Sequence, residues 1–391
     1  MFGNRLQSDE YRLPPLKEVA YIAVLALAFG LLSSSILDSF LRKWNGTAFN
    51  TDIPFNFEST LSYNAPRPFA YRVFFPWLVN TTADLLPSDF VRSPPPELLR
   101  RGLASYMGEQ EIQKIPVVLQ VKFVIAAFWM YLFLFTTLWL YRAIAMWTLH
   151  IHHASADLAT LLFGLFLPLS FRGGGGFIYD FSELFFSTAY IAVLVSRQYV
   201  WAAAILAGAI VNKESNLLLL FYLAAHLLAN DQPLKAKWYL FLRHGISATI
   251  PYVLIKIAMA NKSGGTVEFY LFWNIDYWSK ASSFFGFMTT NLQLALFPKP
   301  TNILFLVLFV WLVGYRWRYK PLFVRASLVS TGLICAILLA MFCWHDEIRN
   351  LSLAFPAIFL AITHSLVEIY RDEPRLDGEV KVTSAPKMRA G

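Results

Sequence analysis

Apolar residues fall into long runs along the chain, and short polar connections separate them. Apolar runs of roughly 20 residues are typical of helices that cross a bilayer. The pattern predicts about ten membrane-spanning helices, over residues 19–37, 117–145, 157–171, 177–196, 199–212, 215–229, 239–260, 302–315, 322–343 and 351–369. The chain is therefore expected to be all-α, a polytopic transmembrane helical bundle.

Two of these runs, 199–212 and 215–229, are short for membrane spans. Backbone groups cannot remain unpaired in lipid, so short helices need protein or water around their ends. We expect this pair to pack inside the bundle or to border a water-filled cavity.

Two connections are much longer than the others, 41–116 and 261–301. Each contains an aromatic, apolar stretch, 68–88 in the first and 284–297 in the second. The first stretch is predicted to be an interfacial or re-entrant helix, and the aromatic second connection, with Asp276 and Lys280 interspersed, is predicted to contain a helix at the headgroup level. For 68–88 and 284–297 a full span is the alternative. We expect one transmembrane domain over 1–370 that includes both connections.

Composition and charge agree with this pattern. Of 391 residues, 57% are hydrophobic and 15% are charged, which excludes a soluble domain and a nucleic-acid-binding domain. Lys and Arg concentrate in alternate short connections, and this bias places both termini in the cytoplasm and the two long connections outside. The polar segment 371–391 has no apolar periodicity and is predicted to be a disordered cytoplasmic tail.

Ionisable side chains of both signs recur at the external helix ends and in the external connections. Charges near membrane depth are costly unless paired or functional, so their recurrence at one face indicates a polar site. The candidate cations for an anionic substrate group are Arg67, Arg72, Arg172, Lys213 and Arg349, and the candidate substrate-binding polar groups are Asp180, Glu183, Glu214, His345 and Glu347. For any one of them, helix capping or interfacial snorkelling is the simpler interpretation.

Asp38 and Arg172 lie at predicted helix ends where a general base and a phosphate ligand can be placed. Asp38 follows the first apolar run, where a carboxylate can serve as a general base. Arg172 precedes four glycines and a helix start, and free amides with a positive dipole end favour a phosphate there. The alternative is a flexible connection followed by Asp180 and Glu183 as first-turn acids. A single histidine with adjacent acids at 345–347 is a weak metal signal, so no metal and no cofactor is predicted, and a divalent metal is the less supported alternative.

The layout resembles the GT-C class of integral-membrane glycosyltransferases. The resemblance rests on a carboxylate after the first span, two external loops and three short motifs. These motifs are Arg67-Pro-Phe-Ala-Tyr-Arg72 before Phe-Phe-Pro-Trp, Asn212-Lys-Glu-Ser215 and Glu347-Ile-Arg349. Ser39 stands where many members carry a second carboxylate.

The resemblance implies a GT-C-like fold in a bacterial inner membrane. It also implies transfer of a sugar from a polyprenyl-phosphate donor to an acceptor hydroxyl of a glycan, lipid or polysaccharide, on the extracytoplasmic face and with inversion. Asp38 would be the base, and the basic side chains would hold the donor phosphate.

Two other functions remain open from the sequence. A polysaccharide polymerase or ligase would use a diphosphate-linked donor, with His345, Arg67 and Arg72 as its polar groups. A lipid or solute transporter would place ionisable groups near the middle of broken helices, whereas most of those in this chain lie at helix ends.

Overall fold

The structure is a computed structural model that describes residues 15–50, 52–172, 177–264, 269–284, 287–289, 296–298, 302–343 and 348–372. It is predominantly helical, which confirms the predicted all-α class. The predicted tail 371–391 begins inside a helix that continues through Asp372, and its remainder lies outside the described residues.

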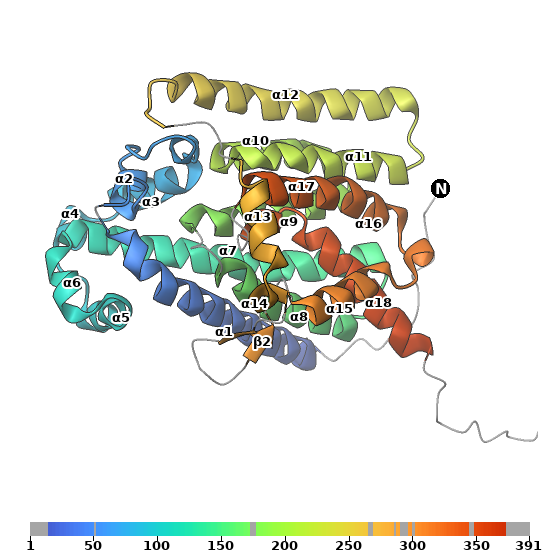
Figure 1. Cartoon of the computed structure of the whole chain (residues 1–391), viewed down its shortest axis with the longest axis horizontal. Helices are drawn as coiled ribbons and strands as arrows, with labels where there is room; N and C mark the ends of the chain where they lie inside the picture. Colours follow the sequence, from blue (N-terminus) through green and yellow to red (C-terminus); the bar gives the residue numbers. More distant parts are fainter. Residues whose placement is uncertain are drawn as a thin grey trace, which may run out of the picture.

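Helices occupy each of the ten apolar runs (Figure 1). They are α1 (Pro15–Ala48), α7 (Val117–Leu149), α8 (His153–Arg172), α9 (Ile178–Val195), α10 (Tyr199–Asn212), η2 (Glu214–Leu219) with α11 (Leu220–Ala229), α12 (Leu234–Ala258), α15 (Ile303–Gly314), α16 (Leu322–Ser327) with η4 (Leu328–Gly332) and α17 (Leu333–Phe342), and α18 (Phe355–Asp372). The short turn η3 (Trp317–Tyr319) separates α15 from α16, and η5 (Ile348–Leu351) precedes α18.

Within the described residues, five helical segments are long and apolar enough to cross a membrane. These are Leu16–Arg42, Val117–Leu149, Ile178–Val195, Leu234–Ala258 and Leu322–Phe342. Four other apolar helices are shorter: His153–Leu167, Tyr199–Asn212, Glu214–Ala229 and Ile303–Gly314. Shorter apolar helices need neighbours that satisfy their ends, which makes their packing against the long helices important.

Helix α9 forms the centre of the bundle and packs against α7 and α10. Two of its buried hydroxyls bond within the helix: Ser187 and Thr188 both donate to the Leu184 carbonyl, at 2.9 and 2.7 Å. Helix α12 lies along one edge against α10 and exposes most of its apolar side chains (Figure 1). An exposed apolar helix at the edge of a bundle is the arrangement expected where lipid is the solvent.

The first long connection forms short helices that gather at one end of the bundle (Figure 1). They are α2 (Phe57–Leu61), η1 (Phe69–Tyr71), α3 (Phe74–Leu85), α4 (Ser88–Arg92), α5 (Glu97–Met107) and α6 (Glu109–Lys114). The stretch 68–88 is not a span, because the 12 residues of α3 extend only about 18 Å, short of a bilayer core of about 30 Å. Helix α3 packs against α7, as a re-entrant or interfacial helix can.

The second long connection contains α13 (Leu271–Ser279), α14 (Ala281–Phe284) and two short strands, β1 (Phe287–Thr289) and β2 (Leu296–Pro298). The strands pair antiparallel, with Phe287 opposite Pro298. The aromatic segment that contains Asp276, predicted to form a helix, holds α13. The stretch 284–297, for which the sequence leaves a span or an interfacial position open, contains β1 and most of β2, strands too short to show a periodicity of their own. Asn274 fixes α13 to the end of α17 by donating to the carbonyls of Ala340 and Cys343, at 2.9 and 2.8 Å.

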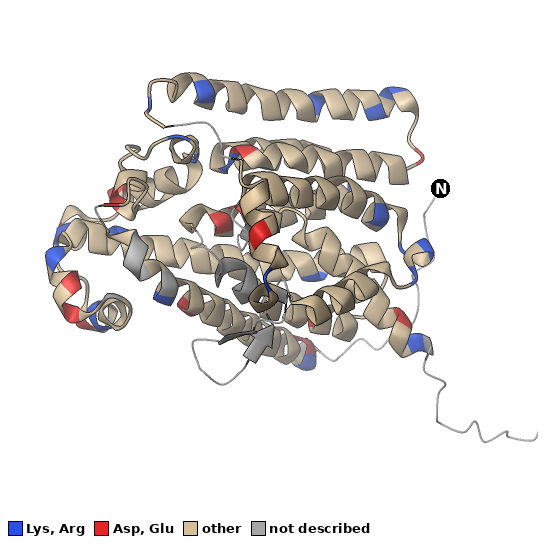
Figure 2. Cartoon of the chain, in the orientation of Figure 1, with Lys and Arg blue, Asp and Glu red and all other residues tan. Residues whose placement is uncertain are grey.

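Charged side chains lie mostly at helix ends and in the connections (Figure 2). At the end opposite the first long connection, Asp157 joins three helices by accepting from Tyr21 on α1 and from Arg142 on α7. The ion pair joins α7 to α8, and the hydrogen bond from Tyr21 adds α1. These contacts fix the relative positions of the three helices at this end.

The close approach of α1 and α8 generates a packing prediction. A Cβ atom at Gly164 would overlap Leu32 and lie 3.0 Å from its Cγ, whereas a Cβ atom at Gly245 on α12 would meet nothing within 4 Å. We expect Gly164→Ala to destabilise the protein by about 1–3 kcal/mol through overpacking. Gly245→Ala is the control and should match or exceed the wild type. Apparent melting temperatures in detergent measure both; equal values for the two variants would contradict this packing.

Candidate functional site

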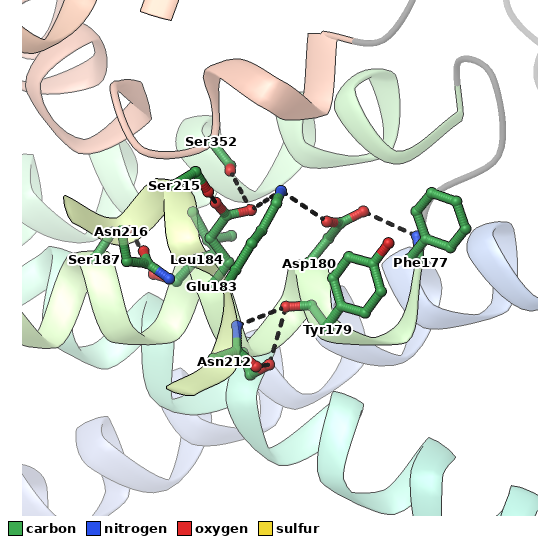
Figure 3. Close-up of polar contacts among 12 residues, drawn as sticks. Phe177, Tyr179, Asp180, Glu183, Leu184, Ser187, Asn212, Ser215, Asn216 and Ser352 are labelled. Carbon is green, nitrogen blue, oxygen red and sulfur yellow. Dashed lines mark hydrogen bonds and ion pairs between the residues drawn. The ribbon is translucent and has the colours of Figure 1, made fainter. Parts of the chain in front are cut away.

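A buried ion cluster lies where α9 begins and α10 ends. Lys213 Nζ lies 2.7 Å from Glu183 Oε2 and 3.3 Å from Asp180 Oδ1. Ser215 donates to Glu183 Oε1 at 2.9 Å, and Ser352 donates to Glu183 Oε2 at 3.2 Å (Figure 3). Lys213 is 6% exposed and both acids are 1% exposed, so this cluster is removed from solvent.

Local sequence explains how these side chains converge. Asp180 and Glu183 are three residues apart on α9 and therefore share a face of that helix. The Asp180 carboxylate also accepts from the Phe177 amide at 2.9 Å, which caps the helix start. Asn212 ends α10; it accepts from Ser182 at 2.6 Å and donates to the Tyr179 carbonyl at 3.1 Å. These bonds hold the end of α10 against α9 and direct Lys213 at the two acids.

Arg72 brings the first long connection to this cluster. Its guanidinium lies 4.1 Å from the centre of the Tyr179 ring and 4.8 Å from that of Phe69, a cation–π arrangement. The next residue, Val73, donates its amide to the Val211 carbonyl at 3.1 Å. Arg72 thereby adds a second positive charge within electrostatic range of Lys213.

The Tyr179 hydroxyl is buried and has no hydrogen-bond partner among the described residues. It points toward the side of Asp180 in Figure 3. A buried hydroxyl without a partner is costly, and it is a ready donor for an anionic or polar group that enters beside Arg72.

Asp38 lies at the same end of the bundle but has different partners. Its carboxylate is 2.8 Å from Arg42 Nε and accepts from the Tyr106 hydroxyl on α5 at 2.8 Å. Its side chain is 40% exposed, unlike those of Asp180 and Glu183. Two residues further on, Phe40 packs edge-on against Phe181, with ring centres 4.8 Å apart, so α1 and the start of α9 are neighbours here.

The remaining predicted residues lie around these two centres or outside the described part. Arg67 donates its amide to the Ser263 carbonyl at 2.7 Å and its guanidinium to the Gly264 carbonyl at 3.2 Å, which joins the first long connection to the start of the second. Glu214 follows Lys213 in the turn, and its Oε2 is buried with no hydrogen-bond partner among the described residues. Arg172 and Arg349 lie in α8 and η5, but the described side chains do not include theirs; His345 and Glu347 lie outside the described residues.

Sequence reasoning missed several functional neighbours. Tyr106, Tyr179 and Ser352 have no charge and no motif of their own, so only the fold brings them to the acids. Lys256, on the last turn of α12, was also missed. Its ammonium lies 3.3 Å from the centre of the ring of Tyr71, the residue that precedes Arg72. A signal existed for Lys256, since it is a lysine near a helix end that the charge distribution predicts to be external, like the other predicted cations.

Within the part of the chain that the structure describes, no group of three or more His, Cys, Asp and Glu side chains could hold a metal ion. No protein-family model, curated protein or solved structure matches the chain. Function must therefore be argued from the geometry of the site.

The buried cluster generates a stability prediction. Lys213→Met should lower the free energy of unfolding by about 3–5 kcal/mol, because two carboxylates would remain buried without their cation. Lys114→Met is the control, since Lys114 pairs with Glu111 on the surface with both side chains more than half exposed. Unfolding in detergent titrations measures the difference. Wild-type stability of Lys213→Met would contradict the burial of this charge, and Lys213→Met/Glu183→Met should be more stable than the single variant.

The Tyr106–Asp38 hydrogen bond generates a pH prediction. Burial, together with the hydrogen bond to Asp38, raises the pKa of Tyr106 from 10.0 to about 12. The neutral phenol therefore contributes stability that is fully present below pH 10.0 and is lost as the pH rises from 10.0 to about 12. The melting-temperature difference between wild type and Tyr106→Phe should shrink across that window. A difference that stays constant or grows would contradict the hydrogen bond.

Proposed function

We propose that the chain is an integral-membrane glycosyltransferase with a GT-C-like arrangement of about ten spans. It moves a sugar from a polyprenyl-phosphate donor to an acceptor hydroxyl at the extracytoplasmic face. The observation that carries the proposal is the pair of centres at one end of the bundle. A solvent-accessible carboxylate, Asp38, lies on α1, and α1 contacts the start of α9 through Phe40 and Phe181, where the buried charge cluster and Arg72 lie.

The chemistry requires a base on one side of the sugar and cations on the other. Asp38 takes the proton of the acceptor hydroxyl as its oxygen forms a bond to the anomeric carbon. The bond from that carbon to the phosphate oxygen breaks, and the phosphate leaves with the electron pair. Attack opposite the leaving group inverts the anomeric carbon. Cations at the leaving phosphate stabilise the charge that develops there.

The predicted cations differ in their positions and in their ion-pair partners. Lys213 is already neutralised by Asp180 and Glu183, which favours a positioning role that holds α9, α10 and the first connection together. Arg72 and Arg67 lie in the first connection, where a lipid phosphate at the membrane surface can reach them. Arg172 and Arg349 stay candidate phosphate ligands, with Glu214, His345 and Glu347 as substrate-binding candidates. The acceptor, a glycan or lipid, approaches Asp38 from the solvent side.

The environment of Asp38 supports its assignment as base. A general base must be reachable by its substrate, and the Asp38 side chain is 40% exposed whereas those of Asp180 and Glu183 are buried. Tyr106 and Arg42 hold its carboxylate in one orientation. The orientation in the membrane, with both termini cytoplasmic, belongs to the same proposal and rests on the distribution of Lys and Arg.

Asp38→Asn tests the proposal. Asn keeps an oxygen that accepts from Tyr106 but cannot take a proton, so transfer should fall at least about a hundredfold while the protein stays folded. Glu111→Gln, which removes an exposed acid from the same connection, should retain activity. The assay follows release of polyprenyl phosphate in proteoliposomes given monophosphate-linked hexoses or pentoses.

Three outcomes would contradict the proposal. Near-normal turnover by Asp38→Asn excludes it as the base. Turnover of a diphosphate-linked repeat unit alone indicates a polymerase or ligase. Movement of the lipid across the membrane without covalent change indicates a transporter.

A further inference from the structure

A cavity of about 260 Å³ opens at the end of the bundle opposite the first long connection. The ends of α7, α9, α11 and the start of α16 meet there, at the right of Figure 1. Four polar residues contribute to its lining: Thr148, Arg197, His226 and Asn230. The described residues that line it include no carboxylate, so the cavity is a positively charged, hydrogen-bonding pocket.

The polar groups around this cavity include hydrogen-bond donors. Tyr199 accepts from the Gln232 amide at 3.0 Å, and its hydroxyl oxygen lies 3.1 Å from His226 Nε2. The Thr148 hydroxyl oxygen is buried and has no hydrogen-bond partner among the described residues. A buried hydroxyl without a partner, in a cavity that a cation also lines, indicates a ligand that accepts hydrogen bonds.

Arg197 supplies the charge of the pocket. Its guanidinium donates to the Asn230 side chain at 3.4 Å, which is a long bond that leaves other donors of the guanidinium available. Its backbone has a φ of +61°, in the left-handed region. The turn between α9 and α10 therefore holds Arg197 at the mouth of the cavity at a conformational cost.

Exposed apolar side chains lie at and near the cavity. Leu322 lines it and is 49% exposed; Trp147 and Leu228, the chain neighbours of the lining residues Thr148 and Ala229, are 47 and 69% exposed. A ligand with an anionic head and apolar chains would place its head among the donors and its chains on this apolar surface. Basic pockets between membrane helices bind phospholipid head groups in this manner.

We propose that this cavity binds a phosphate group, that of an anionic phospholipid head group, with Arg197 and Thr148 as donors. The site lies at the opposite end of the bundle from the proposed sugar transfer and does not depend on it. The bound lipid would hold α7, α11 and α16 together at this surface.

The test uses the full chain in maltoside detergent with three probes: short-chain phosphatidylglycerol, diacylglycerol with the same acyl chains, and inorganic phosphate. Phosphatidylglycerol should raise the melting temperature saturably, and diacylglycerol should not. Arg197→Asn should weaken phosphatidylglycerol binding at least about tenfold, because a charge-assisted hydrogen bond is lost. Asn tolerates the left-handed backbone at this position, so the variant should fold.

Two further variants test the role of the Thr148 hydroxyl and control for the loss of a nearby positive charge. Thr148→Val should weaken phosphatidylglycerol binding severalfold without lowering the melting temperature of the lipid-free protein, since its hydroxyl has no described partner. Lys235→Gln, an exposed base at the same end of the bundle, should bind like the wild type.

The probes also separate the two sources of phosphate. Stabilisation by inorganic phosphate that Arg197→Asn abolishes would support the site with free phosphate as its ligand. Stabilisation by phosphatidylglycerol alone supports a lipid head group. Equal effects of phosphatidylglycerol and diacylglycerol, or wild-type affinity in Arg197→Asn, would overturn the proposal.

Discussion

The ion pair between Lys213 and Glu183 is the interaction on which the proposed catalytic end of the molecule depends. It joins α9 to the turn after α10, and Ser215 and Ser352 add η2 and the segment before α18 to the same carboxylate. A lone buried charge in this setting would be strongly unfavourable, so the helices can pack only in an arrangement that keeps the partners together. Specific packing of the short helices follows from this requirement.

The first long connection is organised by the same cluster. Arg72 stacks on Tyr179, the residue that precedes Asp180, and this contact carries the connection over the bundle end. Asp38 and Tyr106 then attach α5 to α1 on the solvent side. This end of the bundle therefore combines a buried, neutralised charge cluster with the accessible carboxylate of Asp38. In the proposed function, the buried cluster holds fixed the helices that carry the site.

The main helices could be predicted from the sequence, because each of the ten apolar runs is long enough to identify a helix. The short pair 199–212 and 215–229 was also predicted to be unusual, and the structure buries Lys213 in the turn between them. The sequence could not predict which side chains contact one another. Lys213 meets acids about 30 residues away, and Asp38 meets Tyr106 through the packing of α5, a helix too short to have been predicted. Such pairings depend on helix packing, which the apolar pattern does not specify. The strands β1 and β2 were missed because three residues carry no periodic signal.

The most direct measurement is a structure of the reconstituted protein with a polyprenyl-monophosphate sugar bound. The proposed arrangement predicts phosphate density within hydrogen-bonding distance of Arg72 in the first long connection, with the sugar between that phosphate and Asp38. Phosphate density at another place, or a sugar remote from Asp38, would contradict the assignment of donor and base.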